Sequence, residues 1–138
     1  MAGAHRTLAA MYRLHDRRAR IDRQRLGSDA EERAVQLLLQ AGYRIMARNF
    51  RCRMGELDII ARRGRQLVIA EVRLRSSSEY GGPAASISAA KRARVVRAAR
   101  YLLMLRPELA DLVVRFDTLL LSSSAGPIEW IQDAFGTT

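Results

Sequence analysis

The feature that most constrains the fold is a pair of strand-like runs on either side of a short basic turn. Residues 56–62 and 66–73 are rich in aliphatic and β-branched side chains, and Arg63-Gly64-Arg65 separates them. Two such runs with a glycine between them predict an antiparallel β-hairpin. If Gly64-Arg65 forms a two-residue turn with glycine first, Arg63 pairs with Gln66 and the register of the whole hairpin is fixed.

This register places Asp58 directly across from Glu71, and Glu56 across from Arg73. Because side chains alternate along a strand, we expect all four on one face of the hairpin. Opposed Cβ atoms lie about 4.5–5.5 Å apart, so the two carboxylates would repel each other. A divalent cation such as Mg²⁺, which prefers oxygen ligands, would remove that repulsion. Moving the turn back by one residue would instead place Asp58 opposite an isoleucine.

A second interpretation of these acidic residues is a solvated strand face that pairs with nearby arginines. The neighbours of Asp58 and Glu71 are aliphatic, and burying a carboxylate without a cation or hydrogen-bond donors is costly. Spacing alone leaves the metal site and the solvated face equally open.

The remaining segments complete an α/β pattern. Ser28 and Glu31 form a capping box, which predicts a helix near 28–41 that stops at Gly42. Further elements are expected in this order: a strand over 43–50, the hairpin, a loop over 76–83, a helix over 88–105 that Pro107 stops, and strands over 113–121 and 128–132. The order α-β-β-β-α-β-β predicts one domain, with a mixed β-sheet flanked by helices, over residues 27–135. Residues 1–26 are arginine-rich and are interpreted as a basic N-terminal arm or helix.

Composition narrows the partners and the compartment. The chain has 138 residues, 49% of them hydrophobic, and a net charge of +10, which favours a polyanionic partner such as nucleic acid. Its one cysteine allows no internal disulfide and, with two histidines, no usual structural zinc site. We find neither a signal peptide nor a long apolar run and therefore expect a cytoplasmic protein without membrane contact.

Several short motifs resemble those of the YraN-like family of bacterial proteins, and the resemblance covers about residues 26–135. The motifs follow in the family's order: Gly27-Ser28-Asp29-Ala30-Glu31-Glu32-Arg33-Ala34, Arg48-Asn49, Gly55-Glu56-Leu57-Asp58, Ser88-Ala89-Ala90-Lys91, Arg115-Phe116-Asp117 and Asp133-Ala134-Phe135. The family's fold is similar to that of Holliday junction resolvases and other PD-(D/E)xK nucleases. The resemblance therefore implies a restriction-endonuclease-like domain.

The resemblance also implies a catalytic site. Asp58 and Glu71 would bind Mg²⁺ or Mn²⁺, and Glu31 would support the metal or a bound water. The lysine of the family's Glu-Val-Lys motif is Arg73 here. In the hairpin register, Glu56 would orient Arg73 from across the strand pair. Arginine keeps the charge and can bind phosphate, but it cannot accept a proton because its pKa stays above about 12. Compositional drift toward arginine is one explanation, and loss of hydrolysis with retention of binding is the other.

Basic side chains near this site predict contacts with a nucleic-acid backbone: Arg75, Lys91, Arg94 and Arg97. Lys91 is the only lysine in the chain, and its alternative is an ordinary surface residue. Aromatic residues make up only 6% of the chain, which favours duplex or branched DNA over single strands. A homodimer would suit a two-fold-symmetric junction.

Three functions remain open at this point. The first is a metal-dependent DNA endonuclease acting on branched or flapped substrates. The second is a non-catalytic nucleic-acid-binding protein on a nuclease scaffold. The third, supported by charge alone, is a basic protein bound to RNA or ribosomes.

Overall fold

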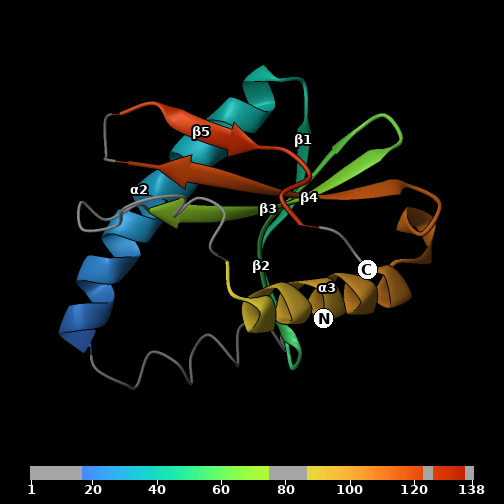
Figure 1. Cartoon of the computed structure of the whole chain (residues 1–138), viewed down its shortest axis with the longest axis horizontal. Helices are drawn as coiled ribbons and strands as arrows, with labels where there is room; N and C mark the ends of the chain where they lie inside the picture. Colours follow the sequence, from blue (N-terminus) through green and yellow to red (C-terminus); the bar gives the residue numbers. More distant parts are fainter. Residues whose placement is uncertain (1–16, 75–86, 123–125, 136–138) are drawn as a thin grey trace.

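The chain folds into a five-stranded sheet with one long helix on each side (Figure 1). The computed structural model describes residues 17–74, 87–122 and 126–135, and over residues 17–28 it describes the backbone alone. The elements are α2 (Arg17–Gln40), β1 (Arg44–Cys52), β2 (Gly55–Arg63), β3 (Gln66–Leu74), α3 (Ala89–Leu105), the 3₁₀ turn η2 (Pro107–Leu109), β4 (Val113–Leu121) and β5 (Ile128–Ile131). This confirms the predicted element order and the α/β, restriction-endonuclease-like class with a mixed sheet.

The sheet has the order β1-β2-β3-β4-β5. All neighbours are antiparallel except β3 and β4, which run parallel. Parallel neighbours need a crossover connection, and α3 with η2 supplies it. The crossover sets the register of β4 against β3 and therefore decides which residues stand beside Glu71.

The predicted hairpin register is confirmed. Arg63 pairs with Gln66, and the ladder continues to Ile59 and Ala70. Gly64 has a φ of 61° while Arg65 does not have a positive φ, as expected for a turn that requires glycine at its first central position. The next rung in this register belongs to Asp58 and Glu71.

Two hydrophobic clusters fill the space between the sheet and the helices. Alternate residues of the central strands face α2 on one side and α3 on the other. The α2 cluster contains Ala34, Val35, Leu38, Ile59, Ala61, Val68, Ala70 and Leu119. The α3 cluster contains Leu57, Ile60, Leu67, Ile69, Val95, Ala98, Ala99, Leu102 and Phe116.

The predicted start of the first helix is wrong. The helix α2 begins at Arg17 and runs through Gly27 and Ser28, so the Ser-x-x-Glu pattern is not a helix cap and the expected domain boundary falls inside the helix. Residues 17–26 contain neither glycine nor proline and are rich in good helix formers. One glycine inside a helix costs only about 1 kcal/mol relative to alanine, which does not end it.

The predicted end of this helix is confirmed. Gly42 has a φ of 89°, its N–H donates to Leu39, and the Tyr43 N–H donates to Leu38 at 3.0 Å. This is the Schellman arrangement, in which glycine takes the left-handed position after the helix. None of the described helices is both long and apolar enough to cross a bilayer.

Candidate functional site

The site lies where the β2–β3 ladder ends. The last paired residues of β2 and β3 are Ile59 and Ala70. Beyond them, the Val72 N–H donates to the side chain of Asp58 instead of a backbone carbonyl, with a distance of 2.9 Å to Oδ2. The Glu71 side chain is only 1% exposed and forms a hydrogen bond with Asp58. The structure therefore brings together the two carboxyl groups that the hairpin register predicted.

Burial is the main reason why the pKa of Glu71 rises from 4.5 to about 10. The negative charge of Asp58 and the hydrogen bond with it act in the same direction, while the positive charge of Lys91 opposes the rise. Since a proton shared between two close carboxyl groups relieves their repulsion, Glu71 is protonated in the metal-free protein at neutral pH.

One oxygen of this pair is left without a partner. Glu71 Oε1 is buried and makes no hydrogen bond, and the same is true of Thr118 Oγ1 on the adjacent strand β4. A buried polar atom without a partner costs about 1–3 kcal/mol, so such atoms are rare away from functional sites. Glu71 and Asp58 thus place carboxylate oxygens side by side, one of them without a hydrogen-bond partner.

The residues present fit Mg²⁺ or Mn²⁺. These cations prefer oxygen ligands, and Mg²⁺ commonly binds through one or two carboxylates while waters and substrate phosphates complete its shell. Among the described residues, no group of three His, Cys, Asp or Glu side chains could hold a metal ion, so Asp58 and Glu71 alone would provide the carboxylates. That donor set suits a substrate-completed site and not a closed structural one.

The strict alternation expected along β2 breaks at Asp58. Leu57 belongs to the α3 cluster and Ile59 to the α2 cluster, although two residues that flank a third should face the same side. The rung opposite Asp58 is occupied by Asn49, whose φ is 54°, and the β1–β2 ladder skips this rung. The left-handed backbone of Asn49 therefore lies at the same rung as the break in the alternation of β2. The shared face of Glu56 and Asp58 stays a prediction.

Glu31 lies in a polar cluster between α2 and β1. Its Oε1 accepts hydrogen bonds from Arg48 and Asn49, both at 2.9 Å, and Arg48 also pairs with Glu32 at 3.0 Å. Glu31 therefore holds the residue opposite Asp58, and its support of a metal ion stays a prediction. Glu56 forms an ion pair with Arg51 at 3.5 Å, and its orientation of Arg73 likewise stays a prediction.

The predicted basic residues divide between the site and the surface. Arg73 is half-buried, two residues beyond Glu71 on β3. Lys91 lies in the first turn of α3, where its N–H is capped by the Ser88 hydroxyl at 3.1 Å, and its charge acts on Glu71. Arg94 and Arg97 are exposed on α3. Arg75 lies outside the described residues.

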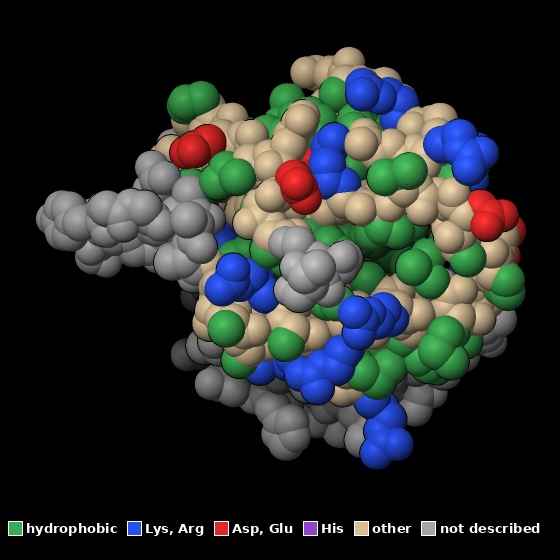
Figure 2. Space-filling view, turned by 45° about the vertical axis from the view of Figure 1, so that its right-hand side comes forward, with side chains coloured by type: hydrophobic (Ala, Val, Ile, Leu, Met, Phe, Trp, Pro, Cys, Tyr) green, Lys and Arg blue, Asp and Glu red, His purple; other side chains and the backbone are tan. Residues whose placement is uncertain are grey.

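Figure 2 shows one face of the molecule, on which Lys and Arg side chains lie in both the upper and the lower half and outnumber the Asp and Glu side chains. Exposed arginines along α3 include Arg92, Arg94, Arg97 and Arg100. This helix, whose first turn reaches the carboxylate pair, thus presents positive charge.

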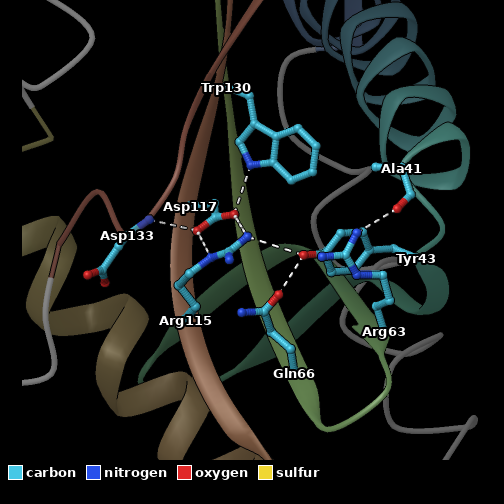
Figure 3. Close-up of polar contacts among 8 residues, drawn as sticks. All are labelled: Ala41, Tyr43, Arg63, Gln66, Arg115, Asp117, Trp130 and Asp133. Carbon is cyan, nitrogen blue, oxygen red and sulfur yellow. Dashed lines mark hydrogen bonds and ion pairs between the residues drawn. The ribbon is translucent and has the colours of Figure 1, made fainter.

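A second buried carboxylate, that of Asp117, lies outside the site and has a structural role. Asp117 is completely buried and accepts two hydrogen bonds at 2.8 Å from the Arg115 guanidinium, one at 2.8 Å from Trp130 Nε1 and one at 2.9 Å from the Asp133 N–H (Figure 3). Arg115 also donates to the Tyr43 hydroxyl at 3.3 Å. Sequence reasoning identified these residues only as motif positions. The available signal was a charged residue, Asp117, in the middle of a strand-like run that is mostly aliphatic.

The fold defines a small single-domain α/β protein with a mixed five-stranded sheet between two helices. The profile described as Uncharacterised protein family UPF0102 matches residues 30–121. The chain belongs to this family, the YraN family, as its motifs indicated.

Similar proteins from several organisms carry the family's name. A UPF0102 protein of Methylobacillus flagellatus is 46% identical over 80% of this chain and 96% of its own length. One from Dechloromonas aromatica is 47% identical over 79% of this chain and 87% of its own. A third, from Saccharophagus degradans, is 43% identical over 79% and 91%.

Proposed function

We propose that this protein is a metal-dependent DNA endonuclease that hydrolyses phosphodiesters, acting in the cytoplasm on duplex or branched DNA. The observation that carries the proposal is Glu71, a fully buried carboxyl group with an unpartnered oxygen, held against a second carboxyl group on the next strand. A purely structural hairpin would replace such a pair with apolar residues, because unpaired buried carboxyl groups destabilise a fold. A cation bound between the two carboxylates would compensate for this destabilisation and would explain why the pair is present.

In this proposal Asp58 and Glu71 hold Mg²⁺ or Mn²⁺. The bound metal would polarise a phosphoryl oxygen and make a water molecule more acidic. Asp58 stays oriented because the Val72 N–H fixes its Oδ2. Glu31 supports the pair through Asn49, which occupies the rung opposite Asp58.

The two cations near the pair take different roles. Arg73 binds and neutralises the phosphate, since a guanidinium donates to phosphate oxygens but does not accept a proton. Lys91 is the only lysine of the chain, and its charge reaches Glu71 from the start of α3. We assign to Lys91 contact with the phosphate next to the scissile one.

The binding surface favours recognition of the DNA backbone. Arg94 and Arg97 extend the positive charge from Lys91 along α3. Backbone contacts give affinity without sequence readout, which suits an enzyme that recognises the shape of a junction or flap.

A second candidate is a non-catalytic protein that binds nucleic acid on the same scaffold. Arg73 favours it, because the E-x-K arrangement of the PD-(D/E)xK nucleases, which this family resembles, has a lysine where this chain has arginine. In that case the metal site would serve binding only.

The test uses purified protein with nicked, flapped and four-way DNA, with EDTA or with Mn²⁺. We expect strand cleavage with Mn²⁺ only, and its loss in Asp58→Asn, which keeps an oxygen for the Val72 N–H but removes the charge. Asp111→Asn, the same substitution at an exposed aspartate just before β4, serves as the matched control and should cleave normally.

Two outcomes would overturn the proposal in different ways. Cleavage that persists in Asp58→Asn would contradict the site. Absence of cleavage in the wild type, together with its appearance in Arg73→Lys, would establish the binding protein instead.

A further inference from the structure

Thr118 stands beside Glu71 on the neighbouring strand. Strands β3 and β4 are parallel, and their register pairs Glu71 with Thr118 directly. Phe116 packs in the α3 cluster and Leu119 in the α2 cluster, so alternation puts the Thr118 side chain on the α3 face. The residues of β3 before Glu71 alternate in the same way, which puts Glu71 on that face too.

Thr118 is completely buried, and its hydroxyl oxygen has no hydrogen-bond partner. A buried hydroxyl without a partner is destabilising, and valine has nearly the same shape without that cost. A threonine at this position is therefore poorly explained by packing. It is explained if the hydroxyl gains a partner in another state of the site.

Glu71 Oε1 is the unpartnered oxygen closest in the strand register. A carboxylate that holds a cation is ionised, and an ionised carboxylate only accepts hydrogen bonds. Its hydrogen bond with Asp58 would then lose the shared proton. The nearby Val72 N–H already donates to Asp58 at 2.9 Å, and Lys91 acts on Glu71 from the start of α3. The strand pairing places the Thr118 hydroxyl directly beside Glu71.

We propose that Thr118 is a positioning residue of the metal site: its hydroxyl donates to Glu71 Oε1 when Asp58 and Glu71 bind a divalent cation, which fixes the orientation of the Glu71 carboxylate toward the metal. This inference rests on the proposed metal site and deepens it. Thr118 does not touch substrate, so it acts through Glu71 alone.

The experiment measures Mn²⁺ binding to the full chain by electron paramagnetic resonance of free Mn²⁺, at one pH and without DNA. Thr118→Val removes the hydroxyl and keeps the shape, while Thr118→Ser keeps the hydroxyl. Hydrogen bonds to charged groups are worth about 1.5–3 kcal/mol, so we expect Thr118→Val to weaken Mn²⁺ binding by roughly tenfold or more. Thr118→Ser should stay within about threefold of the wild type by the same reasoning.

Thermal unfolding in EDTA provides a readout that a merely structural role would change in the opposite way. Because the hydroxyl is unpartnered in the metal-free protein, Thr118→Val should be at least as stable as the wild type there. Loss of stability in EDTA would make Thr118 a structural residue and overturn the inference.

The remaining outcomes separate the two proposals. If the wild type binds Mn²⁺, Asp58→Asn does not, and Thr118→Val binds as tightly as the wild type, the metal site stands and the role of Thr118 is wrong. If the wild type binds no Mn²⁺, the proposed metal site and the role of Thr118 both fall.

Discussion

Glu71 takes up a proton when the metal-free chain folds, because its pKa rises from 4.5 to about 10 in the buried pair. Between these two values the folded state binds more protons than the unfolded state, so the contribution of Glu71 to stability is complete below about pH 4.5 and is lost as pH rises toward 10. One such group changes the free energy of unfolding by up to about 1.4 kcal/mol per pH unit. Glu71→Gln, which cannot ionise, removes this slope.

We therefore predict that urea unfolding in EDTA between pH 5 and pH 9 shows a steeper fall in stability for the wild type than for Glu71→Gln. At pH 9 the variant should be the more stable protein. Asp111→Asn, at an exposed acid just before β4 that does not act on Glu71, should follow the wild type. Parallel pH profiles for wild type and Glu71→Gln would show that Glu71 is not protonated in the fold.

For single residues, the sequence predicted that Asp58 and Glu71 lie together, but it did not predict which residues surround them. Asp58 and Glu71 followed from hairpin arithmetic, because a two-residue turn sets the register locally. The neighbour Thr118 did not, since its place beside Glu71 depends on the crossover through α3, which no local pattern encodes. The left-handed backbone of Asn49 was also missed, because asparagine permits that conformation without requiring it.

The helix α3 and the β1–β2 turn meet at Gly55. A Cβ atom added there would lie 3.0 Å from the Arg94 carbonyl oxygen and 3.2 Å from its Cβ. The helix backbone would have to move, and such overpacking costs about 1–3 kcal/mol. We predict that Gly55→Ala lowers the free energy of unfolding by this amount and shifts the start of α3, which carries Lys91.

Urea unfolding of Gly55→Ala measures this cost, and Gly64→Ala is the comparison. Gly64 has nothing within 4 Å of its added Cβ but a φ of 61°, so its cost comes from backbone strain alone. Both variants should be less stable, but only Gly55→Ala should also weaken binding of Mn²⁺ or DNA. Full stability in Gly55→Ala would contradict the close approach of α3.

Elements were predicted better in the interior than at their ends. The strands and α3 came within a few residues of their observed bounds because their apolar patterns and stop signals agree. The start of α2 failed because a capping-box pattern is only local, and good helix formers before it continued the helix. The Asp117 cluster, which joins β4, the end of β5 and Tyr43, emerged only from tertiary structure.

The whole molecule carries a net charge of +10, and its α3 presents exposed arginines. Each phosphate neutralised by a protein cation adds about 0.9 to the slope of log affinity against log salt. We predict that the double variant Arg94→Gln with Arg97→Gln weakens binding to all DNA shapes and reduces that slope by about 1–2. Fluorescence anisotropy at several salt concentrations measures it.

A matched control lies farther along the chain, just after α3. Arg106 is an exposed arginine that already pairs with Glu108, so Arg106→Gln should leave the salt slope unchanged. If Arg106→Gln reduced the salt slope as much as the Arg94→Gln/Arg97→Gln variant does, DNA binding would depend on net charge and not on this face of α3.

The central claim is that Asp58 and Glu71 together hold a divalent cation. Anomalous scattering from a crystal soaked with Mn²⁺ tests it most directly. We predict one strong peak bonded to oxygens of both carboxylates, absent in Glu71→Gln. A crystal with both side chains in place and no such peak, or with Mn²⁺ only at other acids, would contradict the claim.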